Sequence, residues 1–465
     1  MTSQTLRKKY PQFIYKGYRY KLEKGDLKIS FDFEVPASFE PEALRAEGLS
    51  GVEGPPDISF RPRVVIKDVL PKRSLGRRPK LRLGTLDNLV FHLGLMEIPS
   101  YWKATCSPEI VTEAGSLNKE QIAWWKDLIF KGMGEYFFKN KINFTHQNFL
   151  KITSPLGGPK RSLGRRPKLR LGHKVMVPVG GGKDAAVTLE LLKEGNLDIV
   201  PFLLNPKPEQ MKILNLAKVG KPIVVERTID PKLLELNRKG YLNGHTPFSA
   251  YLAFLTVLTA ALFGHKYIAL SNERSSNEGN VKYLGKTINH QYSKSFEFEK
   301  KFREYSKKYL ASNIEYFSFL RPLYELQIAK IFAKYSKYFG AFLSCNEARK
   351  TKSGTQKQVE KWCGKCPKCL FVFLALYPFA GKKQTVAIFK KDLLRGKKLK
   401  PLLDELTGKK KFKPFECVGT IEESKAALAL ALGKIHDHKV LHAWNSQHFL
   451  PLVFEKLLKK SLRQS

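Results

Sequence analysis

The chain has 465 residues, a hydrophobic content of 43%, and 82 Lys and Arg against 42 Asp and Glu, which gives a formal net charge of +40. The length excludes a single hydrophobic core and predicts two or three domains, and the hydrophobic content is ordinary for a globular protein. The charge predicts an anionic partner, which is nucleic acid, acidic lipid or a polyanionic small substrate.

Residues 1–150 are predicted to form an N-terminal α+β region. The segment Met1 to Tyr10 lacks the apolar core of a signal peptide. Alternating residues predict strands within Phe13 to Val35, and an amphipathic pattern predicts a helix over Leu117 to Phe130. The aromatic residues here are expected to pack in a core rather than stack on a ligand; they are Trp124, Trp125, Tyr136, Phe137 and Phe138.

Residues 151–172 are predicted to be a basic linker, in which Pro159 to Gly172 repeats Pro71 to Gly84 without change. Each copy carries six basic residues and no acidic one, so the chain without both copies has a net charge of +28. Repeats that stack into one structure are longer than this. We interpret the copies as a mobile sequence inserted into surface loops, where insertions are tolerated. Nucleic-acid-binding arms are the alternative.

Residues 173–380 alternate predicted strands and helices. Strands are expected at 175–179, 199–204, 222–226 and 267–270, and helices between them include 184–194 and 248–263. This order predicts an α/β fold, in which helices cover both faces of a parallel sheet and ligands bind beyond the carboxyl ends of the strands. As a helix, 248–263 would span about 24 Å, short of the roughly 30 Å core of a bilayer. We therefore expect a buried helix, no membrane span and a cytoplasmic protein.

The segment Val175-Met-Val-Pro-Val-Gly-Gly-Gly-Lys-Asp-Ala185 is typical of a phosphate-binding loop. Glycines between a strand and a helix start let the backbone N–H groups approach an anion. The Walker and dinucleotide-binding patterns do not fit it. The loop resembles instead the pyrophosphate loop (S-G-G-x-D-S) of the N-type ATP pyrophosphatases, with Gly180 and Ala185 in place of the two Ser. The backbone, Lys183 and Asp184 would then bind the phosphates.

Three of the six cysteines occur in Cys363-Gly-Lys-Cys366-Pro-Lys-Cys369. Thiolates at this spacing can converge on one tetrahedral metal ion, whereas a disulfide framework is not expected in a cytosolic chain. Cys345 is the nearest further cysteine in sequence and is the expected fourth ligand. A closed four-thiolate site favours structural Zn²⁺ over an iron–sulfur cluster, without fixing the metal. Cys106 and Cys417 are expected to be buried or incidental thiols.

Residues 381–465 are predicted to form a basic, helical C-terminal region. Helices are expected over Ile421 to Leu432 and Phe449 to Leu462. The lysines of this region are interpreted as a solvated face.

The loop and the cysteine cluster together resemble the 7-cyano-7-deazaguanine synthase group, which activates a carboxylate with ATP and holds a structural zinc. Further segments narrow the resemblance to the UDP-N-acetyl-α-D-muramoyl-L-alanyl-L-glutamate epimerase family. They are Tyr101-Trp-Lys-Ala-Thr-Cys-Ser-Pro108, Ser271-Asn-Glu-Arg-Ser-Ser-Asn-Glu-Gly-Asn280, Asn289-His-Gln-Tyr-Ser-Lys-Ser-Phe-Glu-Phe-Glu299 and Phe317-Ser-Phe-Leu-Arg-Pro-Leu-Tyr-Glu-Leu-Gln-Ile-Ala329. The resemblance runs from about residue 90 to 380 and leaves out the two basic repeats.

This resemblance implies a PP-loop (adenine nucleotide α hydrolase-like) domain with an N-terminal α+β region and a helical C-terminal extension. It implies an isomerase of peptidoglycan precursor synthesis that converts the terminal L-glutamate of UDP-MurNAc-L-Ala-L-Glu to D-glutamate, using ATP and Mg²⁺. A free carboxylate resists loss of the Cα proton, but a carboxyl-adenylate delocalises the resulting carbanion. The net products would be the D-epimer, AMP and pyrophosphate.

The loop and the resemblance assign the predicted site residues to three roles. ATP phosphates and their Mg²⁺ are assigned to Gly180, Gly181, Gly182, Lys183 and Asp184. Substrate binding is assigned to Asn272, Arg274, Asn277, Glu278, Asn289, Ser293 and Ser295. Proton transfer, carboxylate binding and enolate stabilisation are assigned to Glu273, His290, Tyr292, Lys294 and Glu297, without a choice of the base.

Two other readings stay open. The first is a carboxylate-adenylating enzyme of the deazaguanine or tRNA-modifying type, because the charge and the metal cluster suit RNA. The second is a non-catalytic nucleic-acid-binding protein with a decayed ATP loop, which Ala185 and the basic repeats favour. A nucleic-acid partner is not the preferred reading. The sequence does not indicate the oligomeric state or the role of the first 150 residues.

Overall fold

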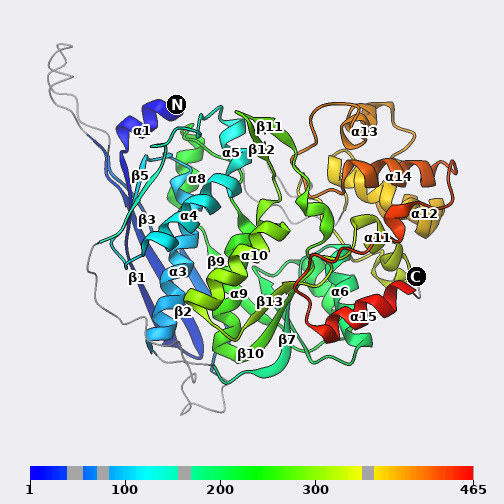
Figure 1. Cartoon of the computed structure of the whole chain (residues 1–465), viewed down its shortest axis with the longest axis horizontal. Helices are drawn as coiled ribbons and strands as arrows, with labels where there is room; N and C mark the ends of the chain where they lie inside the picture. The colour runs from blue at the N-terminus through cyan, green and yellow to red at the C-terminus, as the bar shows by residue number, and fades with distance from the viewer. Residues whose placement is uncertain (39–55, 71–82, 156–168, 348–360, 464–465) are drawn as a thin grey trace. The chain divides into compact units, whose positions relative to one another are not determined.

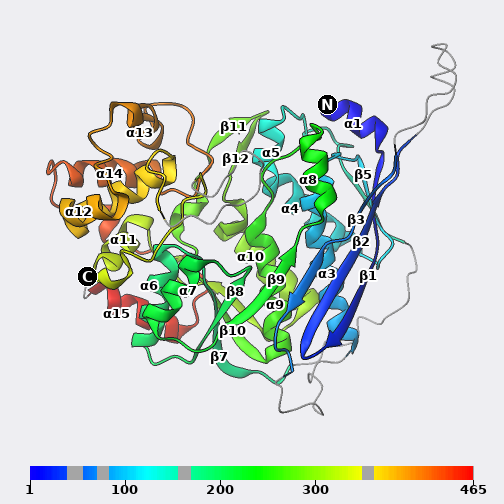
Figure 2. The ribbon, with the colours of Figure 1, turned by 180° about the vertical axis from the view of Figure 1, so that it is seen from behind.

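The computed structural model describes residues 1–38, 56–70, 83–155, 169–347 and 361–463 (Figures 1 and 2). The chain divides into two compact units. The first comprises Met1–Pro167, Glu226–Leu258 and Tyr283–Lys286, and the second comprises Lys168–Val225, Thr259–Lys282 and Thr287–Ser465. The boundaries expected near residues 150, 172 and 380 stay predictions, and the basic repeats lie mainly outside the described residues.

The first unit is built on a long antiparallel hairpin of β1 (Gln12–Glu23) and β2 (Asp26–Val35), which confirms the strands predicted there. Lys24 and Gly25 connect them with φ of 52° and 88°, the backbone that fits the twist of a two-residue hairpin. Further strands of this unit are β3 (Ile58–Phe60), β4 (Arg63–Ile66), β5 (Glu109–Thr112) and β6 (Lys151–Thr153). Strand β5 pairs parallel with β1, and β6 pairs parallel with β5. The short strands β3 and β4 pair antiparallel with β2.

Helices of the first unit are α1 (Ser3–Lys9), α3 (Leu83–Trp102), α4 (Lys119–Gly132), α5 (Gly134–Lys139) and α8 (Pro231–Arg238). Helix α3 packs on β1 (Figure 1). A capping box of Asn118 and Gln121 starts α4 and confirms the predicted helix, two residues later than expected. Trp125 lies 5.1 Å from the ring of Phe254, so this aromatic residue packs in a core as predicted.

Helix α9 (Phe248–Phe263) is the uncharged segment of 16 residues. Ala250, Phe254 and Leu258 are at most 2% exposed, which confirms a buried helix. None of the helices in the described ranges has the length and apolar character needed to cross a membrane.

The second unit contains a parallel sheet in the order β13-β10-β7-β8-β9. Its strands are β7 (Gly172–Pro178), β8 (Ile199–Leu204), β9 (Ile223–Thr228), β10 (His265–Leu270) and β13 (Glu315–Ser318). The first four confirm the predicted strands, and β13 was not predicted. From β7 the chain adds β8 and β9 on one side and then β10 and β13 on the other. The strand order therefore reverses between β7 and β10, where α/β sheets bind ligands.

The helices of the second unit are α6 (Lys183–Glu194), α7 (Pro208–Ala217), α10 (Phe296–Tyr305), α11 (Glu325–Ala333), α12 (Pro367–Phe389), α13 (Lys400–Leu406), α14 (Ile421–Ala431) and α15 (Leu452–Arg463). Short strands β11 (Val281–Tyr283) and β12 (Lys286–Ile288) pair with each other. Helix α6 packs against α7, α11 and α15, and α12 packs against α11, α13 and α14 (Figure 2). The mixed α/β class with a mostly parallel sheet is thus confirmed.

The predicted C-terminal helices are present as α14 and α15, and α15 belongs to the core of the second unit. Phe454 of α15 is fully buried and its ring centroid lies 4.7 Å from that of Phe317 on β13. The exposed residues of α15 include Lys459 and Lys460. On α15, these lysines therefore lie on the outer face of a helix whose apolar face is packed.

Candidate functional site

Three carboxylates meet at the carboxyl edge of the parallel sheet. Asp184 follows β7 through the glycine loop, Glu273 follows β10, and Glu325 begins α11 after β13. These three strands are neighbours, so their ends lie side by side. One oxygen from each carboxylate lies within 4.8 Å of the other two. Oxygen ligands in such a group suit a divalent cation such as Mg²⁺.

Two buried lysines offset part of this negative charge. Lys183 is 3% exposed and donates hydrogen bonds to Asp184 and Glu325. Lys368 is 6% exposed and its Nζ lies 3.8 Å from Glu325. Burial, together with the charge of Glu325, raises the pKa of Glu273 to about 7. Mutual repulsion of the carboxylates thus favours a bound cation at this point.

The glycine loop joins β7 to α6 as predicted, and its glycines differ in their surroundings. An ideal Cβ on Gly181 would lie 2.3 Å from Cγ of Glu209 and 2.7 Å from the carbonyl oxygen of Leu343, whereas one on Gly180 would meet nothing within 4 Å. Gly182 is the N-cap of α6, and within the described part of the chain no side chain caps this helix. Its first N–H groups and its dipole are therefore able to interact with an anion.

Arg321 fixes the segments that carry the predicted site residues. This side chain is fully buried and pairs with Glu299 of α10 at 3.0 Å. Its guanidinium also donates to the carbonyl oxygens of Glu273, at 2.6 Å, and Lys294. Five N–H donors in one planar fork allow one arginine to hold three segments at once.

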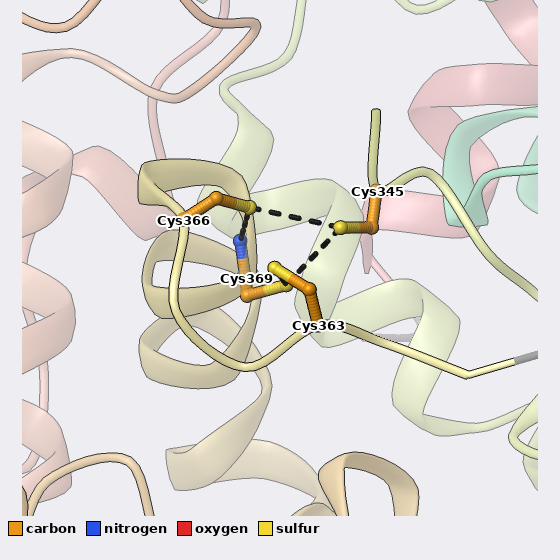
Figure 3. A group of neighbouring side chains, drawn as sticks. All are labelled: Cys345, Cys363, Cys366 and Cys369. Atoms are coloured by element: carbon orange, nitrogen blue, oxygen red, sulfur yellow. Dashed lines mark hydrogen bonds between the residues drawn. The ribbon is translucent and has the colours of Figure 1, made fainter. Parts of the chain in front are cut away.

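The four predicted cysteine ligands converge at the start of α12 (Figure 3). The Sγ atom of Cys345 lies 3.7 Å from that of Cys366 and 3.6 Å from that of Cys369, and Cys363 lies 3.6 Å from Cys369. A tetrahedral site with Zn–S bonds of about 2.3 Å places sulfur atoms about 3.8 Å apart. The four thiols are therefore arranged to hold one metal ion of this geometry.

Comparison with known proteins decides the family. A model of the MurL N-terminal domain matches residues 59–319, and one of the MurL C-terminal domain matches residues 341–451. The chain is similar to three proteins named UDP-N-acetyl-alpha-D-muramoyl-L-alanyl-L-glutamate epimerase. The relative from Salinispora tropica is 36% identical over 75% of this chain and 74% of the relative, and the relative from Micromonospora is 37% identical over 75% of each. The relative from Xanthomonas oryzae is 36% identical over 71% of each.

The chain belongs to the UDP-N-acetyl-α-D-muramoyl-L-alanyl-L-glutamate epimerase family. The predicted family is therefore confirmed, and with it the prediction of an isomerase. Both matched regions reach into the second unit, where the N-terminal model includes the carboxylate-bearing residues Asp184 and Glu273. The C-terminal model includes the cysteine cluster and Cys417.

Several predicted site residues of this epimerase-family chain hold loops together. Ser295 caps α10, Asn277 accepts a hydrogen bond from the backbone of Phe296, and Asn289 donates to the carbonyl of Ser276. Further residues have comparable contacts: Asn272 with Ser318, Arg274 over the ring of Tyr324, Glu278 with Lys413, and buried Tyr292 with Phe298. Ser293 is buried, and Glu297 lies on the exposed face of α10, paired with Lys301 at 2.7 Å.

Sequence reasoning missed four residues of this site: Arg321, Glu325, Lys368 and Cys417. The first two stand in the apolar segment Phe317 to Ala329, where two charges among buried residues were the available signal. Lys368 lies inside the cysteine motif and donates to the carbonyl of Cys417. Cys417, expected to be a buried or incidental thiol, accepts a hydrogen bond from Lys294 at 3.2 Å. No local pattern in the sequence relates Cys417 to Lys294.

Proposed function

We propose that this protein epimerises the terminal L-glutamate of UDP-MurNAc-L-Ala-L-Glu to D-glutamate through a carboxyl-adenylate, with ATP and Mg²⁺, in peptidoglycan precursor synthesis. The observation that carries the proposal is the carboxylate group of Asp184, Glu273 and Glu325 beside a glycine loop, in a chain whose relatives are named for this reaction. The glycine loop would act as a PP-loop, which separates the α- and β-phosphates of ATP.

Each part of the site would have a distinct task. The N–H groups at the start of α6 would hold phosphate oxygens, and the three carboxylates would hold the cation. Bound Mg²⁺ supplies charge that neutralises the phosphates. Lys183 keeps Asp184 and Glu325 oriented, since it donates to both. The large positive charge of the chain suits a substrate with a diphosphate and two carboxylates.

We assign Zn²⁺ to the cysteine cluster as a structural ion. Four thiolates leave no open coordination position, so the ion would act by fixing the chain. The cluster joins Cys345 to the start of α12, and Leu343, two residues before Cys345, donates to the carbonyl of Gly181 at 2.6 Å. The metal would thus stabilise the segment that contacts the glycine loop.

The test incubates the purified protein with ATP, Mg²⁺ and UDP-MurNAc-L-Ala-L-Glu in D₂O. We expect AMP, pyrophosphate and D-glutamate that carries deuterium at Cα. Glu325→Gln should lower AMP formation at least about tenfold through loss of a cation ligand. Exposed Glu304→Gln of α10 is the matched control and should keep the parental rate.

Recovery of unlabelled L-glutamate from the parent would contradict the epimerase proposal. AMP formation that ignores the muramoyl dipeptide but depends on an RNA would support the tRNA-modifying reading. Absence of any ATP turnover would support a nucleic-acid-binding protein.

A further inference from the structure

Cys417 lies apart from the four-cysteine cluster, in a segment that Asn280 links by hydrogen bonds to the residues around the site. Asn280 donates through Nδ2 to the carbonyl of Pro414 at 2.7 Å, and its own carbonyl accepts from the N–H of Lys413 at 3.1 Å. The same Asn280 accepts a hydrogen bond from the backbone of His290 at 2.8 Å. Asn280 therefore brings Cys417, from near the C-terminus, to the Asn289–Lys294 segment.

Positive groups surround the half-buried thiol of Cys417. The Nζ atom of Lys294 lies 3.2 Å from Sγ, and Lys368 donates to the carbonyl of the same residue. The side chain of His290 also interacts with the thiol, and Glu416 is the negative group beside it. Burial alone would raise the pKa of Cys417, but Lys294, His290 and Lys368 lower it to about 5. Cys417 is therefore a thiolate at neutral pH.

Lys294 interacts electrostatically with both the thiolate of Cys417 and the carboxylates of the site. Burial lowers the pKa of Lys294, but Cys417, Glu273 and Asp184 together raise it above its ordinary value. Lys294 therefore stays an ammonium, which has no lone pair to accept a proton. Next to it, Gln291 is 4% exposed and its Oε1 has no hydrogen-bond partner among the described residues. An unsatisfied buried acceptor in this segment is consistent with a ligand that completes the site.

We propose that the thiolate of Cys417 is the base that exchanges the Cα proton of the substrate glutamate, an assignment that rests on the function proposed above. The Cα–H bond breaks and an S–H bond forms, while the electron pair passes into the activated carbonyl as an enolate. Protonation of the opposite face of Cα by a proton from water then gives the D-epimer, and the thiol releases its proton to solvent. Lys294 is a positioning residue that stabilises the thiolate.

The experiment separates the two half-reactions in Cys417→Ser and Cys417→Ala, with circular dichroism to verify folding. Both variants should release AMP and pyrophosphate in response to UDP-MurNAc-L-Ala-L-Glu within about threefold of the parent, since the adenylating groups are intact. D-glutamate formation and deuterium uptake at Cα should fall at least about 100-fold, as for loss of a general base. Near-parental epimerisation, or equal loss of both half-reactions, would overturn the assignment. A parent that forms no D-glutamate would instead overturn the proposed function.

A second measurement tests the thiolate directly. Iodoacetamide should alkylate Cys417 at pH 6 nearly as fast as at pH 8, with the modified peptide quantified by mass spectrometry. Fully buried Cys106, whose pKa burial raises, is the internal reference and should stay unmodified. Lys294→Met should slow alkylation at pH 6 at least about tenfold, and Lys294→Arg should restore it in part. A rate that falls with pH as for an ordinary thiol in the parent would overturn the assignment.

Discussion

Of the three glycines in the loop between β7 and α6, Gly181 has the least space for a Cβ atom. Its carbonyl accepts from Leu343, and the side chain of Glu209 covers its Cα. Its φ is not positive, so close approach of neighbouring atoms, and not backbone conformation, requires the missing Cβ. Gly180, one residue earlier, has open space in the same direction.

We predict that Gly181→Ala lowers the free energy of unfolding by about 1–3 kcal/mol, because the new methyl group must displace Glu209 or the Leu343 backbone. Gly180→Ala, in the same loop, should change it by less than about 0.5 kcal/mol. Urea denaturation followed by fluorescence measures both. Equal stabilities of the two variants would contradict this reading of the loop.

How much of the site the sequence could predict differs between residues. Short local motifs contain Gly181, Asp184 and three of the four cysteines of the cluster, and the spacing within each motif is enough to predict the kind of site. Glu325 and Cys417 become part of the site only through the fold. The pairing of β13 with β10 brings Glu325 to the site, and the hydrogen bonds of Asn280 bring Cys417. Glu297 lies on the exposed face of α10, which its place in a polar segment did not reveal, and its assigned role stays a prediction.

At the scale of elements, the strands and helices around the loop were predictable because their apolar runs are long and bounded by polar turns. The four residues of β13 are too few to show a period, and the strand was missed. This omission hid the third strand end of the site, where α11 begins with Glu325. A short edge strand between longer elements is therefore the weak point of this prediction.

The cysteine cluster ties a loop to the first turn of α12, so we predict that metal removal destabilises the second unit. Chelation of the purified protein should release about one Zn²⁺ per chain and lower its melting temperature, since structural zinc contributes strongly to folding. Cys363→Ser should purify with less metal, and chelator should shift its melting temperature much less. Cys106→Ser, outside the cluster, is the control. An unchanged melting temperature of the parent after proven metal loss would contradict a structural role.

At the scale of the whole molecule, the net charge of +40 exceeds what one small substrate needs, and the basic repeats supply 12 of these charges. The electrostatic field of a strongly basic protein accelerates the association of an anionic ligand without changing the chemical step at the site. In the proposed function, the basic surface would attract the anionic substrate, and the carboxylates at the sheet edge would bind the cation.

We predict that the KM for the muramoyl substrate rises severalfold between about 0.1 M and 1 M NaCl, as the screening length falls from about 10 to 3 Å, while kcat changes less than about twofold. A variant without residues 71–82 and 159–168 should keep parental kcat and a similar salt dependence if the repeats are inert insertions. Steady-state assays of both proteins measure this. A loss of salt dependence on deletion would instead assign the repeats to ligand attraction.

The hydrogen bond from Leu343 to Gly181 has a thermodynamic consequence. The segment of residues 343–345 contacts the glycine loop at one end and carries Cys345 of the cysteine cluster at the other. Two ligands that order the same three residues are energetically coupled, and such coupling is reciprocal. If zinc strengthens nucleotide binding by a given factor, nucleotide strengthens zinc retention by the same factor. If the proposed function holds, loss of zinc would then weaken ATP binding by that same factor.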